Sequence, residues 1–186
     1  NFNLRIRAGE HVAIVGGIGT GKTTLAHLLL KLRTPSAGRI TFNGASLASL
    51  SSKTVREVVH YVPQQPRLFN RTLWENLRYG NPNPKLTPET VYALLRRLKM
   101  TDVEAVFRQK MHKSVGKQGS HLSGGQRQTV VLLRAVFNTR AKILVLDEPT
   151  SALDATNRDH VLQLVREVAK GRTLLVITHD DALVQQ

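Results

Sequence analysis

A glycine-rich stretch near the start of the chain has the residue types that bind phosphate. Residues 16–23 read Gly-Gly-Ile-Gly-Thr-Gly-Lys-Thr and fit the pattern G-x-x-x-x-G-K-[ST]. Glycines let the main chain wrap closely around a phosphate, and successive N–H groups at the start of a helix attract the anion. Lys22 would neutralise the β- and γ-phosphate oxygens, and the hydroxyl of Thr23 can bind Mg²⁺. The stretch therefore predicts polyphosphate binding.

Two carboxylates follow a short apolar run later in the chain. Residues 143–146 are Ile-Leu-Val-Leu, and Asp147 and Glu148 come directly after them. At the carboxyl end of a parallel strand, such residues lie beside the phosphate loop. There Asp147 would hold Mg²⁺ through water, and Glu148 would polarise an attacking water. Taken alone, the same pattern also fits a strand that runs into a solvated turn.

A second glycine pair begins another predicted helix. Ser123 and Gln126 have the spacing of a capping box, and Gly124 and Gly125 leave the first N–H groups of that helix exposed. This predicts a second anion-binding helix start, so that one chain offers two phosphate-seeking surfaces. Taken alone, the stretch equally fits a capped helix with a flexible lead-in.

The elements that must position these residues alternate between strand and helix patterns, which predicts an α/β fold with an inserted helical lobe. The predicted strands are 1–7, 11–15, 39–42, 58–62, 143–146 and 173–178, the first of them antiparallel. The predicted helices are 22–32, one that has Pro88 at its first position, one capped by Thr101 and Glu104, one that follows Ser123, and one that Gly171 ends.

Composition fits a globular domain, or one domain with a lobe. Of 186 residues, 41% are hydrophobic and 22% charged, and no apolar run approaches the roughly 18 residues of a membrane-spanning helix. With no cysteine, disulfides, thiolate metal sites and cysteine nucleophiles are excluded.

Charge is unevenly distributed along the chain. The formal net charge of the chain is +14. Residues 67–117 hold eleven basic and four acidic residues, so this stretch carries a net charge of 11 − 4 = +7, half of the total. Such a lobe could face nucleic acid, an anionic membrane surface or an acidic partner, or could simply be a solvated face.

Together, six motifs resemble the nucleotide-binding domain of an ATP-binding cassette (ABC) transporter. Residues 16–23 match its Walker A loop, 122–128 its signature, 143–148 its Walker B strand, Gln64 its Q-loop, 151–154 its D-loop and His179 its switch histidine. The resemblance implies a P-loop NTPase core, with a mostly parallel sheet flanked by helices, a small antiparallel β subdomain and an inserted α-helical signature subdomain. We expect residues 1–65 and 119–186 to form the ATP-binding core and residues 66–118 the helical subdomain.

The resemblance also implies ATP and Mg²⁺ as cofactors and a second cassette, identical or different, as partner. ATP would be held by Gly16, Gly17, Ile18, Gly19, Thr20, Gly21, Lys22, Thr23 and Thr24. The partner's ATP would meet the signature residues Leu122, Ser123, Gly124, Gly125 and Gln126 and the D-loop residues Ser151, Ala152, Leu153 and Asp154. The implied catalytic residues are Glu148, His179 and Gln64, and the implied metal ligands are Thr23, Gln64 and Asp147.

Residues 68–77 and 115–119 resemble the exporter branch, although Lys117 stands where exporters usually carry a glutamate. This implies an ATPase that powers transport through a membrane domain in the same or a partner polypeptide, at the cytoplasmic face of a membrane. The alternative is a soluble ABC ATPase that acts on the ribosome or on nucleic acid, but nucleic acid is not the expected partner. The family places an adenine-stacking aromatic residue upstream of the point where this chain begins, and more chain follows its switch histidine. Because both are missing here, we expect a cassette cut at both ends.

Overall fold

The computed structural model describes residues 3–17 and 19–184. Within these residues the chain divides into two compact units, each built from separate segments. The first, here called the sheet unit, comprises the described residues of Asn1–Pro63, Arg140–Glu148 and Gly171–Gln186. The second, here called the helical unit, comprises Gln64–Thr139 and Pro149–Lys170.

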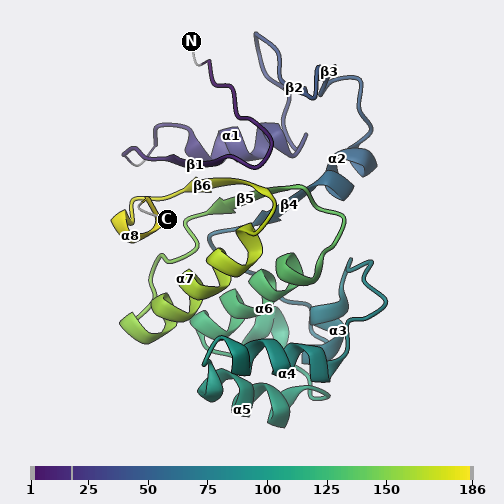
Figure 1. Cartoon of the computed structure of the whole chain (residues 1–186), viewed down its shortest axis with the longest axis vertical. Helices are drawn as coiled ribbons and strands as arrows, with labels where there is room; N and C mark the ends of the chain where they lie inside the picture. The colour runs from purple at the N-terminus through teal and green to yellow at the C-terminus, as the bar shows by residue number, and fades with distance from the viewer. Residues whose placement is uncertain (1–2, 18, 185–186) are drawn as a thin grey trace. The chain divides into compact units, whose positions relative to one another are not determined.

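A four-stranded parallel sheet is the centre of the sheet unit (Figure 1). Its strands lie in the order β1-β6-β5-β4, and their bounds are β1 His11–Ile14, β4 Val59–Val62, β5 Ile143–Asp147 and β6 Thr173–Ile177. The two central strands, β5 and β6, are almost entirely buried. This fits their continuous Val, Leu and Ile runs, because a strand covered on both faces has no polar alternation.

Three helices and a small hairpin complete the sheet unit: α1 Lys22–Leu29, β2 Thr41–Phe42, β3 Ala45–Ser46, α2 Ser52–Val58 and α8 Asp181–Val184. Strands β2 and β3 form an antiparallel pair around Asn43 and Gly44, as the turn signal predicts. Side chains of α1, α2, β4, β5 and β6 share one hydrophobic core. The α/β fold with its parallel sheet and small antiparallel pair is thus confirmed.

The predicted strand over residues 1–7 is wrong for the described part, because residues 3–7 form no strand. The alternation of Leu4 and Ile6 supplies an apolar face. A strand also needs a neighbouring strand to which its main chain can hydrogen-bond, and the alternation does not supply one. Instead, Arg7 and Glu10 close a turn, in which the main-chain N–H of Glu10 donates to the carbonyl of Arg7 over 3.1 Å.

Helix α1 ends three residues earlier than its apolar spacing predicts. It stops at Leu29 because Lys31 adopts a positive φ of 55°. The ammonium of Lys31 donates to the carbonyl of Ala48 over 2.8 Å and also to the carbonyl of Leu50. These contacts lie outside the helix, so tertiary structure overrides the local pattern.

The helical unit contains five α-helices and one short 3₁₀ turn: α3 Leu73–Arg78, α4 Pro88–Arg97, α5 Thr101–Lys110, η1 Lys117–Gly119, α6 Gly124–Phe137 and α7 Ala155–Ala169. Pro88 occupies the first turn of α4, as predicted. The predicted capping box of α6 is also present, with Ser123 and Gln126 exchanging hydrogen bonds of 3.2 and 3.0 Å.

The predicted cap of α5 is wrong. Met100 precedes the helix as its N-cap residue, so Thr101 is already helical and makes no capping bond. Glu104 is buried instead, and its Oε1 accepts from Arg96 over 2.9 Å and from Arg108 over 2.8 Å. The Glu104 carboxylate therefore binds two guanidinium groups in a buried position and does not cap the helix.

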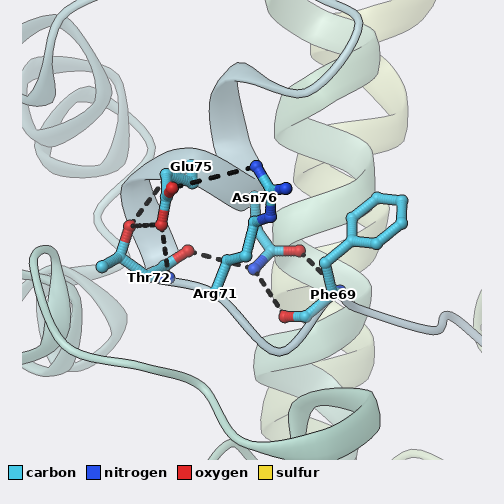
Figure 2. A network of polar contacts seen from close by, with 5 residues as sticks. All are labelled: Phe69, Arg71, Thr72, Glu75 and Asn76. Carbon is cyan, nitrogen blue, oxygen red and sulfur yellow. Dashed lines mark hydrogen bonds and ion pairs between the residues drawn. The ribbon is translucent and has the colours of Figure 1, made fainter.

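Helix α3 begins with a capping box formed by Thr72 and Glu75, within the stretch 68–77 (Figure 2). The hydroxyl of Thr72 accepts from the N–H of Glu75 over 3.1 Å, and the Glu75 carboxylate accepts from the N–H of Thr72 over 2.9 Å. One turn on, the amide of buried Asn76 binds both the N–H and the carbonyl of Phe69, at 2.9 and 3.0 Å. This network fixes the segment that leads into α3.

None of the helices within the described residues is both long enough and apolar enough to cross a bilayer.

Candidate functional site

The predicted phosphate loop lies between β1 and α1 of the sheet unit. Gly19 and Gly21 have positive φ values of 80° and 93°, a backbone conformation that favours glycine. Gly21 is the N-cap residue of α1 and supplies no side chain to its first N–H groups. These donors are therefore available to an anion. Ile18 lies outside the described residues.

The side chain of Lys22 folds back over this loop. Its Nζ donates to the carbonyl oxygens of Gly16 over 2.6 Å and Gly17 over 2.7 Å. Thr20 Oγ1 donates to the carbonyl of Gly17 over 2.9 Å and braces the same turn. A fixed ammonium group and free helix N–H groups together form an electrostatic cradle for phosphate. Thr23 and Thr24 are exposed on the first turn of α1.

The carboxylates Asp147 and Glu148 lie at the carboxyl edge of the sheet. The strand register aligns Asp147 of β5 with Ile177 of β6, and Ile177 with Ile14 of β1. Because the phosphate loop follows Ile14 closely, the loop and the carboxylates share one edge of the sheet. This is the juxtaposition that the sequence predicted.

Tyr61 holds Asp147 from the neighbouring strand β4. Its hydroxyl donates to Asp147 Oδ2 over 3.1 Å. Burial raises the pKa of Tyr61 far above its ordinary value, and the charge of Asp147 raises it further. The phenol therefore keeps its proton and remains a hydrogen-bond donor.

His179, just beyond β6, contacts Glu148 directly. Its Nδ1 lies 2.9 Å from Oε1 and 2.8 Å from Oε2 of that carboxylate. Because an ionised carboxylate only accepts hydrogen bonds, His179 must donate through Nδ1. Glu148 itself has a positive φ of 47°, unusual for a residue with a β-carbon. The structure thus brings together the predicted base and the predicted switch histidine.

The donor set of the sheet unit fits a hydrated Mg²⁺. Buried Asp147 is 2% exposed, and its Oδ1 has no hydrogen-bond partner among the described residues. Within the same residues, no cluster of three His, Asp or Glu side chains could hold a metal. Mg²⁺ is commonly bound by one or two carboxylates together with water and substrate phosphate, so a single free carboxylate oxygen and the Thr23 hydroxyl suit it.

The signature residues lie in the helical unit, at the start of α6. Leu122 is buried, Ser123 and Gln126 form the cap, and Gly124 is exposed. Gly125 is buried so closely against α7 that a β-carbon there would lie 2.1 Å from Asn157 Oδ1. Only glycine therefore fits at position 125 unless Asn157 moves.

The D-loop residues lead into α7 of the same unit. Asp154 caps this helix by accepting from the N–H of Asn157 over 2.9 Å and from its Nδ2 over 2.6 Å. These hydrogen bonds hold the pKa of Asp154 below its ordinary value. Asp154 thus fixes Asn157, which in turn faces Gly125. Among the three D-loop residues before it, Ser151 and Leu153 are half-buried and Ala152 is exposed with a φ of 58°.

Gln64 is exposed and begins the helical unit. The structure therefore groups the predicted residues in two sets. Lys22, Asp147, Glu148 and His179 belong to the sheet unit, whereas Gln64, the signature and the D-loop belong to the helical unit.

Sequence reasoning missed Tyr61 and Asn157 as supporting residues. Both lie within or beside a named motif, but their partners Asp147 and Gly125 are 86 and 32 residues away in the sequence. The one local signal for the role of Tyr61 was that its polar hydroxyl lies inside an apolar strand. No sequence pattern pointed to Asn157.

A phosphate loop after the first strand of a parallel sheet, with carboxylates at the end of another strand, defines a P-loop nucleotide-binding protein. Residues 1–151 match the family model described as ABC transporter. The chain therefore belongs to the ABC transporter family, as its motifs predicted, and this membership implies ATP binding.

Two named proteins are similar to this chain over most of its length. Over 180 residues the chain is 40% identical to an ATP-dependent lipid A-core flippase of Ralstonia nicotianae, a match that covers 96% of this chain and 30% of that protein. It is 38% identical over 180 residues to the mitochondrial potassium channel ATP-binding subunit of Rattus norvegicus, covering 96% and 25% of the two chains.

The chain is also similar to a solved structure. The bacterial Atm1-family ABC exporter with ATP bound matches with a TM-score of 0.82 and 34% identity, over 95% of this chain and 30% of that chain. The chain therefore spans 30% or less of the length of these three proteins.

Proposed function

We propose that the chain binds and hydrolyses ATP with Mg²⁺ as one cassette of a pair, and that this reaction powers an exporter-like membrane transporter. The membrane domain would belong to the same or a partner polypeptide, and the cassette would work at the cytoplasmic face of the membrane. The observation that carries the proposal is the Glu148–His179 pair, which lies at the sheet edge that also bears the Lys22 loop.

The residues of the sheet unit would divide the chemistry between them. The Lys22 ammonium and the N–H groups of α1 would bind the β- and γ-phosphates. Glu148 would accept a proton from the attacking water, while His179 holds its carboxylate in place. Asp147 and Thr23 would hold Mg²⁺, which when bound neutralises developing charge on the phosphate oxygens. Gln64 is a further metal ligand that the family resemblance implies.

The helical unit would serve the nucleotide of a second cassette. Ser123, Gly125 and the start of α6 offer N–H groups and a hydroxyl to a γ-phosphate, and Asp154 would link the two sites. The division into a core of residues 1–65 and 119–186 and a subdomain of residues 66–118 remains a prediction. The transport functions of the named relatives favour this proposal over a soluble ATPase acting on the ribosome or nucleic acid.

Two variants test the assignment in the chain. Lys22→Ala removes the ammonium of the phosphate loop, and we expect loss of binding of a fluorescent ATP analogue. Glu148→Gln keeps the shape of the carboxylate without its basicity, so binding should persist while phosphate release falls by about 100-fold or more. Unchanged phosphate release in Glu148→Gln would refute the role of general base.

A further inference from the structure

Tyr61 and Asp147 lie on the same face of the parallel sheet. The register pairs Tyr61 of β4 with Val145 of β5, and Asp147 comes two residues after Val145. Because side chains alternate along a strand, Val145 and Asp147 point to one face, and Tyr61 lies beside them on the neighbouring strand. The phenol thus reaches towards the end of β5, where its hydroxyl donates to Asp147 Oδ2 over 3.1 Å.

Helix α1 holds the ring of Tyr61 from the other side. Tyr61 packs against the hydrophobic core that α1 shares with the sheet. The ring of His27 lies edge-on to it, with centroids 6.2 Å apart and ring planes at 77°, a favoured geometry for aromatic pairs. Strand and helix together therefore fix the position of the hydroxyl that contacts Asp147.

The two oxygens of the Asp147 carboxylate have different surroundings. Oδ2 accepts from Tyr61, whereas Oδ1 has no hydrogen-bond partner among the described residues, although Asp147 is only 2% exposed. A buried acceptor without a partner costs free energy, and a bound cation or its water would recover that cost. Asp147 therefore presents one oxygen to a ligand, and Tyr61 determines which one.

The other carboxylate at this edge of the sheet is also engaged. His179 Nδ1 lies 2.9 Å from Oε1 and 2.8 Å from Oε2 of Glu148. A cation beside the phosphate loop would accordingly meet one oxygen of Asp147 and no carboxylate with both oxygens open to it.

Calcium and magnesium differ in what they require from a carboxylate. Ca²⁺ takes about six to eight oxygen ligands and often binds both oxygens of one carboxylate. Mg²⁺ is smaller, keeps several of its waters, and is commonly bound through one or two carboxylates together with phosphate. A carboxylate with one oxygen already hydrogen-bonded therefore suits Mg²⁺ and disfavours bidentate binding of Ca²⁺.

We propose that Tyr61 determines which metal the nucleotide site accepts, by holding Asp147 through Oδ2 so that only Oδ1 is left and Mg²⁺ is preferred to Ca²⁺. Tyr61 acts through Asp147 and is a positioning residue. The inference rests on the proposed function, because that function places the metal of the nucleotide beside Asp147.

The test compares the affinity of a fluorescent ATP analogue in Mg²⁺, in Ca²⁺ at the same concentration, and in EDTA. We expect the unsubstituted chain to bind the analogue more tightly with Mg²⁺ than with Ca²⁺. Tyr61→Phe opens Oδ2 to a bidentate cation, so the ratio of the dissociation constant in Ca²⁺ to that in Mg²⁺ should fall by about fivefold or more, since a hydrogen bond to a charged group is lost. A purely structural loss would change both constants alike and leave the ratio unchanged.

Two matched replacements isolate the hydroxyl. Tyr79→Phe removes the same group from a ring that is 60% exposed, and it should leave the ratio unchanged. The amine of para-aminophenylalanine at position 61 donates from the same place on the ring and should restore the preference for Mg²⁺. An unchanged ratio in Tyr61→Phe, an equal fall in Tyr79→Phe, or an amine variant that behaves like Tyr61→Phe would overturn the proposal.

The same titrations separate this proposal from the proposed function. Lys22→Ala should lose the analogue with either metal, because it lacks the ammonium of the phosphate loop, whereas Tyr61→Phe should bind it with both. Metal-dependent binding with one ratio in the unsubstituted chain and in Tyr61→Phe contradicts only the role of Tyr61. Absence of analogue binding by the unsubstituted chain contradicts the proposed function, and the assignment of Tyr61 with it.

Discussion

The hydroxyl of Tyr61 shows how a residue outside the predicted site can hold one of the predicted metal ligands, Asp147, in place. It is the hydrogen-bond partner of Asp147 Oδ2, and the other oxygen of that carboxylate has none among the described residues. The buried charge therefore depends on a single phenol, which keeps its proton because burial and Asp147 raise its pKa.

Tyr61→Phe should accordingly destabilise the fold. The substitution leaves a buried carboxylate unpaired, and we expect a loss of about 1–3 kcal/mol in the free energy of unfolding. Urea denaturation followed by circular dichroism measures it. Tyr79→Phe is the control, because Tyr79 is 60% exposed and its hydroxyl makes no hydrogen bond in the described chain. Equal effects of the two changes would contradict the importance of the Asp147 contact.

At the scale of elements, one side chain of α7, that of Asn157, contacts a residue of each of the two predicted motifs, Gly125 of the signature and Asp154 of the D-loop. Asp154 at the start of α7 fixes Asn157, and Asn157 leaves no room for a β-carbon at Gly125 of α6. The D-loop and the signature are thus connected within the helical unit through the contacts of Asn157.

Gly125→Ala should therefore separate the two helices or displace Asn157. We expect a destabilisation of about 1–3 kcal/mol, the usual cost of overpacking a tight contact. The double variant with Asn157→Ala should recover most of this loss, because the added methyl group then has space. A thermodynamic cycle from urea denaturation measures the coupling, and strictly additive effects would argue against the contact.

A charged cluster ties α4 to α7 and makes stability depend on pH. Glu167 of α7 accepts from Arg97 of α4 over 2.5 Å and from Lys170 over 2.6 Å. Burial opposes the charge of Glu167, but these hydrogen bonds outweigh it and hold the pKa of Glu167 below its ordinary value. The stabilisation is therefore complete above the unfolded-state pKa of about 4.3 and is lost as pH falls through the folded-state value.

We expect Glu167→Gln to lower stability near neutral pH by less than about 1 kcal/mol, since the pair is partly solvated, and to flatten the acid limb of the pH–stability curve. Thermal melts between neutral and acid pH provide the measurement. Glu57→Gln, at an exposed position without an ion pair in the described chain, is the control. An acid limb that Glu167→Gln leaves unchanged would contradict this assignment.

The elements that local signals define were predicted, and those that depend on distant partners were not. Glycines, prolines and caps mark the phosphate loop, α4 and α6 within a few residues of sequence. Residues 3–7 form no strand because no partner strand is present among the described residues, and the early end of α1 accompanies contacts of Lys31 with residues 17 and 19 positions away. Glu104 has its partners Arg96 and Arg108 only eight and four residues away, but its burial between them was not evident from the capping pattern. The same holds at the site, where motifs located Asp147 and Gly125 but their supports Tyr61 and Asn157 required the fold.

On the scale of the whole molecule, the two sets of site residues predict complementation between chains. If two cassettes pair head to tail, each nucleotide meets the Lys22 loop of one copy and the Ser123 end of α6 of the other. Lys22→Ala and Ser123→Glu should each be inactive alone, yet a mixture should regain activity, because one of its two sites combines intact halves. Phosphate release from mixed samples over a range of concentrations is the measurement, and a mixture as inactive as its components would contradict the pairing.

The order of strands in the sheet has a consequence for biosynthesis. Strand β1 pairs with β6, and Gly9 just before β1 donates a hydrogen bond to Thr173, which is 164 residues further along the chain. During translation, β1 therefore cannot pair with β6 until β6 has left the ribosome, and the phosphate loop after β1 is synthesised before this pairing can form. Such non-local pairing slows folding, and the waiting strand is open to aggregation or to chaperones. The nascent chain thus carries a phosphate loop long before it has a sheet that can hold the carboxylates beside it.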